Sequence, residues 1–382
     1  MLLKSAEIQV FKVDNDTFEI IGGINHFTSL IWPDKFNGYA TFELNAPVTP
    51  ENKMLLKKDN IIWCGGDNAA KIEIITAEIN ENGEKMFNVK GRTLEQLLTT
   101  RVILGTYNCK SKHTSTAMYE IVDSQCVNPV DEYRKIPYLE CAVDEQLGKM
   151  ISFQKTGGEV YESLESIAND SDLGFDVLFR PKEKKLIFKV TEGIDRTVLQ
   201  QSNNSSNFVI FSTEFEDILS SSYYMNNEDI KTLAYVAGEG EGAERKRIIS
   251  GNNASKGLER KELYIDARDL QSEIYHDDGS TTTMTDDDYY DLLNDRGMEK
   301  LAECNFIESF EAKMRVIGDI QYKYGVDYFK GDKVIIQDEE LGIQVIAKIV
   351  EVNECFDDEY ELEIMFGYSY PTIIEKLKRR IT

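Results

Sequence analysis

The sequence predicts a mainly β protein with α+β modules, and three observations support this fold class. Apolar and polar residues alternate over many short segments, as they do in half-buried strands. These segments are rich in β-branched and aromatic residues, including 19 Tyr and 18 Phe, which favour strands over helices. One strand-turn-strand pattern also occurs twice along the 382 residues, a length that suggests roughly two to four domains.

The first part of the chain, residues 1–105, is expected to form a compact antiparallel β domain. Asp14-Asn15-Asp16 marks the first turn, and residues 33–38 mark the second. We expect strands within 207–235 to complete this domain. The predicted strands are 6–13, 17–21, 27–32, 39–44, 61–63, 71–79 and 85–90.

Residues 106–206 predict a small α+β domain. Apolar residues recur at helical spacing in 116–126 and 159–169, and a hairpin is expected over 173–190. The segment 200–207 is rich in Ser and Asn and is typical of a linker.

A second β domain is expected from 236–270 and 305–382, interrupted by an acidic helical insertion at 271–304. Thr285, followed by three aspartates, is typical of a capped helix start. The predicted strands after the insertion are 310–316, 334–336, 343–352 and 360–366.

The two β domains share a sequence pattern. Residues 57–63 resemble 330–336, and the same offset without a gap matches 78–81 with 351–354. A short amphipathic helix is expected after each copy, at 93–98 and at 371–377. We therefore predict two related units, with Asp59 and Asp332 at equivalent positions. The alternative is chance, because any two hairpins share alternating apolar residues.

A glycine-rich run follows the predicted strand 232–237. It lacks the features of a phosphate-binding loop, because glutamates alternate with its glycines and a basic triplet replaces the apolar helix. We interpret it as a subunit junction, in which glycine allows close packing and basic side chains meet acidic patches of a neighbour. The candidate inter-subunit contacts are Gly238, Gly240, Gly242, Arg245, Lys246, Arg247, Arg260 and Arg268.

Two motifs in this chain resemble a known family. The segment from Gly257-Leu258 to Asp266-Ala267-Arg268-Asp269-Leu270, with Arg260 and Glu262 between, is the first. A Trp-Pro-Asp segment at 32–34, followed by Gly-Tyr-Ala-Thr-Phe-Glu-Leu at 38–44, is the second. Together they resemble the siphovirus Gp37-like tail hub proteins of long-tailed bacteriophages, most specifically over 1–105 and 235–270.

That resemblance implies two antiparallel β-barrel domains of the tail-tube type, with two smaller domains inserted beside them. It implies a homotrimer whose ring closes the tail tube, adapts six-fold to three-fold symmetry and gives DNA a channel. The implied partners are the tail tube or distal tail protein, the tape-measure protein and a tail spike or fibre protein, with DNA passing only transiently. The implied location is the virion tail tip or baseplate, after assembly in the bacterial host cytoplasm.

Charge and composition exclude several classes of protein. The formal net charge of −25 opposes stable binding of DNA and suits a channel wall, although an acidic surface also serves solubility alone. The six cysteines form no Cys-x-x-Cys pair, so we expect reduced thiols. No apolar run has transmembrane length, and the first residues lack the apolar core of a signal peptide, so we expect no membrane segment.

No catalytic residue, metal ligand set or cofactor is predicted. His113, next to Thr114 and Ser115, has no glycine elbow of a serine hydrolase. His276 and the aspartates near it lack the glutamate of an EF-hand loop.

We therefore expect a structural protein and not an enzyme. Trp32 and Trp63 are expected in β-domain cores rather than against sugars. The sequence ends at Thr382 just after the second β domain, so we expect lytic or adhesive activity on another protein. The alternatives are a cell-wall or glycan hydrolase of the tail tip and a monomeric β-rich binding protein.

Overall fold

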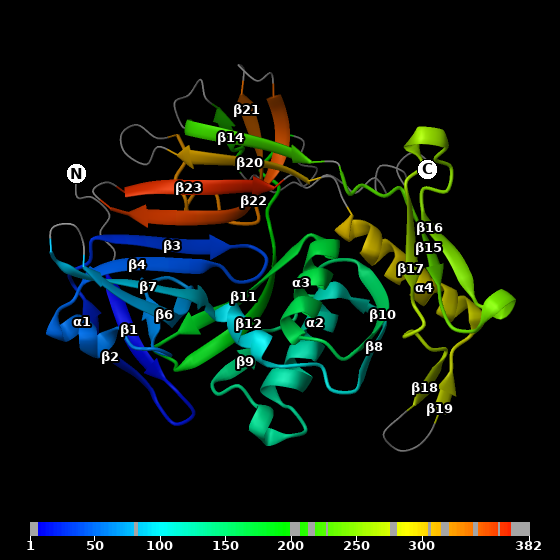
Figure 1. Ribbon diagram of the computed structural model, residues 1–382, viewed down its shortest axis with the longest axis horizontal. Helices are drawn as coiled ribbons and strands as arrows, with labels where there is room; N and C mark the ends of the chain where they lie inside the picture. Colours follow the sequence, from blue (N-terminus) through cyan, green and yellow to red (C-terminus); the bar gives the residue numbers. More distant parts are fainter. Residues whose placement is uncertain are drawn as a thin grey trace.

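The computed structural model of the chain describes residues 7–79, 83–198, 207–212, 218–226, 228–275, 281–304, 307–314, 321–338, 343–357 and 360–367. Its strands and helices form two β halves and two smaller units, which lie beside one another in Figure 1. The mainly β fold predicted from the alternating sequence pattern is confirmed.

The first β half is an antiparallel sheet in the order β3-β4-β7-β6-β5-β1-β2, with the short helix α1 (Pro50–Leu55) beside it. Alternate side chains of its strands are buried, as in β4, and Trp32 lies in this core. The strands are β1 (Ile8–Val13), β2 (Phe18–Ile24), β3 (Ser29–Lys35), β4 (Thr41–Pro47), β5 (Ile61–Trp63), β6 (Ala69–Ile79) and β7 (Lys85–Thr93).

The second β half repeats that strand order as β14-β20-β23-β22-β21-β13. Its pairs are antiparallel like those of the first half, except that β13 is parallel to β21. The strands are β13 (Ile210–Ser212), β14 (Ile218–Asn226), β20 (Ile307–Met314), β21 (Lys333–Asp338), β22 (Ile343–Phe356) and β23 (Tyr360–Gly367).

The two halves join edge to edge through β22 and β3, which run side by side in Figure 1. The result is one 13-stranded sheet. The resemblance implied two separate barrels, and that expectation is wrong for the described residues. Neither half forms a closed barrel in these residues. Edge strand β3 of the first half pairs with β22 of the second half, and β2 and β14 lie at the two ends of the joint sheet.

An α+β unit packs against the first half. Helices α2 (Thr114–Val122) and α3 (Val160–Ser171) cover a sheet of β11 (Leu173–Arg180), β12 (Lys185–Glu192) and β9 (Leu139–Cys141). A second ribbon pairs β8 (Thr106–His113) with β10 (Met150–Thr156). A π turn (Asp123–Val127) extends α2, and a 3-10 helix (Glu132–Arg134) follows it. Phe11 and Phe18 of the first half pack into the core of the α+β unit. The predicted helix at 93–98 is the 3-10 helix η1 (Leu94–Thr100).

The smallest unit contains a three-stranded sheet covered by one helix. The sheet order is β16 (Arg247–Gly251), β15 (Leu233–Ala237) and β17 (Glu262–Asp266). Helix α4 (Asp286–Glu303) packs on it, and Thr285 caps the helix as expected. Two 3-10 turns (Gly242–Glu244 and Gly257–Glu259) and the ribbon β18 (Glu273–Tyr275) with β19 (Thr281–Thr283) complete the unit.

Two expected boundaries differ from this arrangement. Strands in 207–235 were expected to complete the first half, but β13 and β14 pair with β21 and β20 of the second half. Residues 236–270 were expected in the second β domain, but their strands pair with β15 and pack on α4. Alternating strands look alike in sequence whichever sheet they enter, so pairing partners were decided by tertiary contacts.

Backbone hydrogen bonds identify equivalent positions in the two halves. The Asp59 N–H donates to the Ile72 carbonyl at 3.0 Å, and the Gly331 N–H donates to the Ile349 carbonyl at 2.7 Å. Asp59 and Gly331 also have similar positive φ angles of 71° and 87°. Asp59 is therefore equivalent to Gly331, and its predicted equivalence with Asp332 is wrong by one residue.

The error of the ungapped sequence alignment grows after the next turn. A register shift lies between Ile72 and Ile74 in β6, and the matching shift lies between Ile349 and Glu351 in β22. Ile72 is thus equivalent to Ile349, whereas the ungapped alignment matched it with Val345, because the β21–β22 hairpin is longer than β5–β6. The repeated strand order supports the duplication, but the sequence match at 78–81 does not reflect it. The helix expected at 371–377 lies outside the described residues.

Candidate inter-subunit surfaces

Within the chain, the two β halves contact each other through paired edge strands. β22 and β3 pair antiparallel over six residues, from Glu351 opposite Lys35 to Phe356 opposite Leu30. Phe356 and Leu30 are both buried in the core of the first half. The junction therefore combines a backbone ladder with apolar packing, as within a single sheet.

Phe36 packs where the first half, the α+β unit and the second half meet. It is buried, and its ring or backbone lies against Gly174 of β11 and Gly331 of the turn before β21. A Cβ added at Gly331 would overlap the ring, and one at Gly174 would lie 2.5 Å from it. The Lys348 ammonium lies 4.1 Å from the centre of the same ring. Glycine is required here because no side chain fits between the backbones and Phe36.

A buried group of charges lies beside this contact. The Lys330 ammonium is 2.5 Å from a carboxylate oxygen of Asp34 in β3 and 2.5 Å from one of Asp176 in β11. Asp34 also accepts hydrogen bonds from Tyr324 at 2.6 Å and from Asn68 at 2.5 Å. One lysine of the second half thus holds carboxylates from two other units.

Glu95 of η1 is the third carboxyl group near Lys330. Its Oε1 accepts a hydrogen bond from the Val177 N–H at 2.8 Å, and the side chain is buried. Burial raises the pKa of Glu95 to about 7, and the charge of Asp176 adds to the effect. Burial also raises the pKa of Asp176, against the attraction of Lys330. Burial acts to lower the pKa of Lys330, but the surrounding carboxylates outweigh it and raise that pKa.

Three more ion pairs connect the α+β unit to the second half. Asp332 accepts hydrogen bonds from the Ile194 N–H at 2.9 Å and from the Arg196 guanidinium at 2.5 Å, and both side chains are buried. Asp172 is paired with Lys348 at 2.6 Å and with Lys333 at 2.7 Å. These contacts orient the halves about the β22–β3 pairing.

The outer half of β6 is a different kind of edge. From Ile74 to Ile79 every side chain is exposed, and this stretch includes three isoleucines. Ile74 is 58% exposed and Ile79 is 66% exposed. A long, apolar, exposed strand edge is a ready site for pairing with another strand.

Comparison with known proteins identifies the kind of molecule that carries these surfaces. A family model described as Siphovirus ReqiPepy6 Gp37-like protein matches residues 7–368. The chain belongs to this family. It is a structural protein of a bacteriophage or prophage tail. The siphovirus Gp37-like resemblance of the sequence motifs is therefore confirmed.

Solved structures show the same fold at low identity. A tail protein from Neisseria meningitidis is 12% identical, with a TM-score of 0.54, and the match covers 97% of this chain and 99% of that one. A 43 kDa prophage tail protein from Shewanella oneidensis is 12% identical, with a TM-score of 0.53, and the match covers 94% and 97%. Comparison with curated proteins finds no match.

The glycine-rich run of this family member lies at the end of β15. A Cβ at Gly238 would lie 2.5 Å from the Tyr289 hydroxyl of α4, so glycine permits close packing within the chain. Gly240 and Gly242 have φ angles of 94° and 55°, which glycine adopts readily. The Tyr289 hydroxyl accepts from the Glu239 N–H at 2.9 Å and anchors the loop to the helix.

The basic residues near this run make contacts within the chain. Arg245 donates to the carbonyls of Gly238 and Ala237 at 2.9 and 2.8 Å and pairs with Asp266. Arg268 pairs with the same Asp266, and those contacts lower the pKa of that carboxyl to about 2.

The remaining candidates are placed similarly. Lys246 pairs with Asp286 at 2.8 Å, and Arg260 pairs with Glu262 at 2.7 Å. Arg247 donates to the Gly242 carbonyl at 3.2 Å. An intramolecular role thus accounts for much of the sequence signal, and contact with a neighbouring chain stays a prediction.

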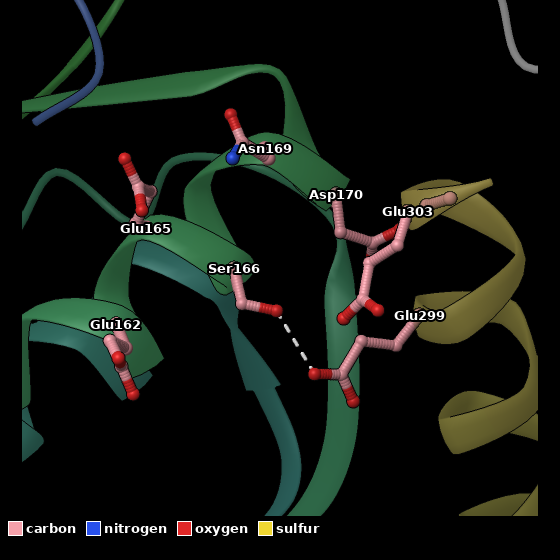
Figure 2. Close-up of a pocket in the computed structure, with 8 residues that line it drawn as sticks. Glu162, Glu165, Ser166, Asn169, Asp170, Glu299 and Glu303 are labelled. Atoms are coloured by element: carbon pink, nitrogen blue, oxygen red, sulfur yellow. Dashed lines mark hydrogen bonds between the residues drawn. The ribbon is translucent and has the colours of Figure 1, made fainter. Parts of the chain in front are cut away.

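A cavity of about 440 Å³ lies between α3 and α4. Figure 2 shows its acidic lining, in which the Ser166 hydroxyl donates to Glu299 at 2.9 Å. The lining residues are Glu162, Glu165, Ser166, Asn169, Asp170, Glu299, Ala302 and Glu303, so five of the eight carry carboxyl groups. Within the described residues, no group of His, Cys, Asp or Glu is arranged to hold a metal, and no helix is long and apolar enough to cross a membrane.

Sequence reasoning missed the buried charges of the junction. Asp34 was assigned to a turn, but it lies in strand β3, and Lys330 was noted only as part of the repeated pattern. Asp176 and Glu95 lie in apolar segments, which is the signal that identifies them as buried carboxyls in need of a partner.

Proposed function

We propose that this tail protein forms a trimeric ring that closes the tail tube and adapts six-fold to three-fold symmetry. The observation that carries the proposal is the repeated strand order of two halves joined through β22 and β3. Three chains with two similar halves each supply six similar units around one axis. Such a ring matches a six-fold tube on one face and a three-fold tip on the other.

The ring gives DNA a channel during ejection. The net charge of −25 supports this role, since an acidic lumen repels the phosphates of duplex DNA and prevents retention. The partners expected at the two faces are the tail tube or distal tail protein with the tape-measure protein above, and a spike or fibre protein below. The role is mechanical, and the chain is expected to have no enzymatic activity.

Native mass spectrometry and negative-stain imaging of the purified chain test the ring. The expected result is a species of three 43.7 kDa chains that images as a ring with a central opening. A monodisperse monomer at every concentration tested, with or without the tube protein, would overturn the proposal.

An assay on host peptidoglycan tests the mechanical role separately. The expected result is no release of soluble fragments by the purified trimer. Release that a single carboxylate substitution in the α3–α4 cavity abolishes, such as Glu299→Gln, would favour the hydrolase alternative.

A further inference from the structure

The strand equivalences extend from β6 and β22 to β3 and β14. Ile74 and Glu351 directly follow the matching register shifts, and they pair with Lys90 of β7 and Met365 of β23. Lys90 and Met365 are therefore equivalent. Their partners Glu43 and Glu311 are then equivalent in β4 and β20.

The next strand follows from the same ladders. Glu43 pairs with Ile31 of β3, and Glu311 pairs with Ser222 of β14. β14 of the second half is therefore the counterpart of β3 of the first, residue for residue over this stretch.

The junction inside the chain uses only half of the edges that this repeat creates. The outer residues of β22, from Glu351 to Phe356, pair with β3. Their counterparts in β6 are Ile74 to Ile79, and β14, the counterpart of β3, ends the sheet. The outer half of β6 and the strand β14 are thus left as two complementary free edges of the described sheet.

Exposure of side chains follows the same division. In β22, Val352 is 0% exposed and Phe356 is 8% exposed. Their counterparts in β6 are Ile75, which is 37% exposed, and Ile79, which is 66% exposed. Both halves have apolar residues at these equivalent positions, but within a single chain only the second half buries them.

We infer that the outer half of β6 pairs antiparallel with β14 of a neighbouring copy of this chain. The inference rests on the proposed ring and deepens it by naming both edges and their register. Carrying the β22–β3 register across places Ile74 opposite Asn226 of the neighbour and Ile79 opposite its Ser221. Between them, Glu78 lies opposite Ser222, as Cys355 lies opposite Ile31 inside the chain.

A second copy is the occupant because the chain carries both complementary edges and already shows how they fit. The contact is head-to-tail, so each copy offers β6 to one neighbour and β14 to the other, and the series closes when the rotation fits. Closure covers the outer half of β6 and the edge strand β14, which removes the exposed edges that a monomer presents. Extended backbone pairing of this kind supplies affinity, and the isoleucines supply apolar contact.

Disulfide trapping tests the register. A chain with Glu78→Cys is mixed with a chain with Ser222→Cys, dissociated and reassociated, and then oxidised. The expected product is a covalent dimer of one chain of each kind, because residues directly opposite in antiparallel strands lie within disulfide reach. The off-register control replaces Ser222→Cys with Tyr223→Cys, and it is expected to give at least tenfold less dimer.

The chain supplies its own positive control. Ile31→Cys is directly opposite the natural Cys355 across the β22–β3 junction, so it is expected to form the equivalent bond within one chain. The unmodified chain, with its six cysteines, measures background crosslinking.

The outcomes separate this inference from the proposed ring. A trimer by mass with no in-register crosslink overturns the pairing and leaves the ring standing, and equal crosslinking off register also overturns it. A monomer without crosslinks overturns both.

A substitution provides the second measurement. Ile79→Asp is expected to raise the dissociation constant of the trimer at least tenfold. Ile20→Asp, at a similarly exposed position on β2, is expected to leave the trimer unchanged. Equal effects of the two would contradict the inference.

Discussion

Lys330 binds three units together through a single buried charge. It lies between Asp34 and Asp176, with the carboxyl of Glu95 near enough to raise its pKa. Buried carboxylates of this kind are costly without a partner, because desolvation penalises each charge. The charges therefore specify how the units are arranged, and removal of the lysine leaves carboxylates unpaired.

Replacing Lys330→Met is expected to lower the free energy of unfolding by about 3–5 kcal/mol, since one side of a buried ion pair is lost. Lys90→Met is the matched control, because Lys90 pairs with Glu43 at the surface and such a pair contributes less than about 1 kcal/mol. Urea denaturation at a fixed chain concentration measures both. Similar losses for the two variants would show that Lys330 contributes no more to stability than a surface lysine does.

Glu95 makes the stability depend on pH. Its pKa in the folded chain is about 7, above the ordinary value of 4.5, so folding takes up a proton between those values. The contribution of Glu95 to stability is therefore expected to be complete below its ordinary pKa of 4.5, to fall as the pH rises toward 7 and to level off above it. The total fall is on the order of 3 kcal/mol, because each tenfold change in an acid dissociation constant corresponds to about 1.4 kcal/mol.

The variant Glu95→Gln is expected to lose this fall and to be more stable than the natural chain at pH 8. Its amide oxygen still accepts from the Val177 N–H, so the packing is retained. Thermal unfolding between pH 5 and 8 measures the effect, with the exposed Glu19→Gln as control. An unchanged pH profile in Glu95→Gln would assign the dependence to another group.

At the scale of elements, the turn before β21 fixes the distance between the halves. Gly331 combines a φ of 87° with direct contact to Phe36, so both its backbone and its missing side chain matter. Gly325 has a similar φ of 78° but open space around it. The two positions separate backbone strain from packing.

Gly325→Ala is expected to cost about 1–2 kcal/mol from left-handed strain alone. Gly331→Ala is expected to cost a further 1–3 kcal/mol or so, because the new methyl group displaces Phe36. Chemical denaturation of the two variants checks the difference. Equal costs would mean that Phe36 moves freely and that the junction is loosely packed.

At the scale of the whole molecule, acidity and assembly act together. In the proposed ring, a net charge of −25 on each of three chains would produce a strong field around the channel. The proposed subunit contacts depend on backbone pairing and isoleucine packing, which tolerate that charge better than ion pairs would.

The assembled chain is expected not to retain duplex DNA, even at about 50 mM salt, where basic proteins bind strongly. A mobility-shift assay with duplexes of unrelated sequence measures this, beside a basic DNA-binding protein as control. Binding that weakens steeply with salt would mean that a basic surface faces the lumen and that the acidic residues serve solubility.

Sequence patterns predicted most strands and the main helices, because alternation and helical spacing are local properties. The cap at Thr285, the hairpin around 181–184 and the duplication were all visible in this way. The candidate contacts were less predictable. Arg245 looked available in sequence, yet it pairs with Asp266, which only folding brings beside it. Arg268 pairs with the same carboxylate from two residues away in the chain.

The sequence by itself determined that the chain is mainly β, acidic and internally repeated, and its motifs carried the family resemblance. Only the tertiary structure decided which strands pair, and so it placed β14 in the second half and aligned Ile72 with Ile349 rather than Val345. It also gathered Lys330, Asp34 and Asp176 at one point. The reason is physical: side-chain periodicity fixes which face of a strand is buried, whereas register and partner depend on hairpin lengths and on contacts between residues far apart in sequence.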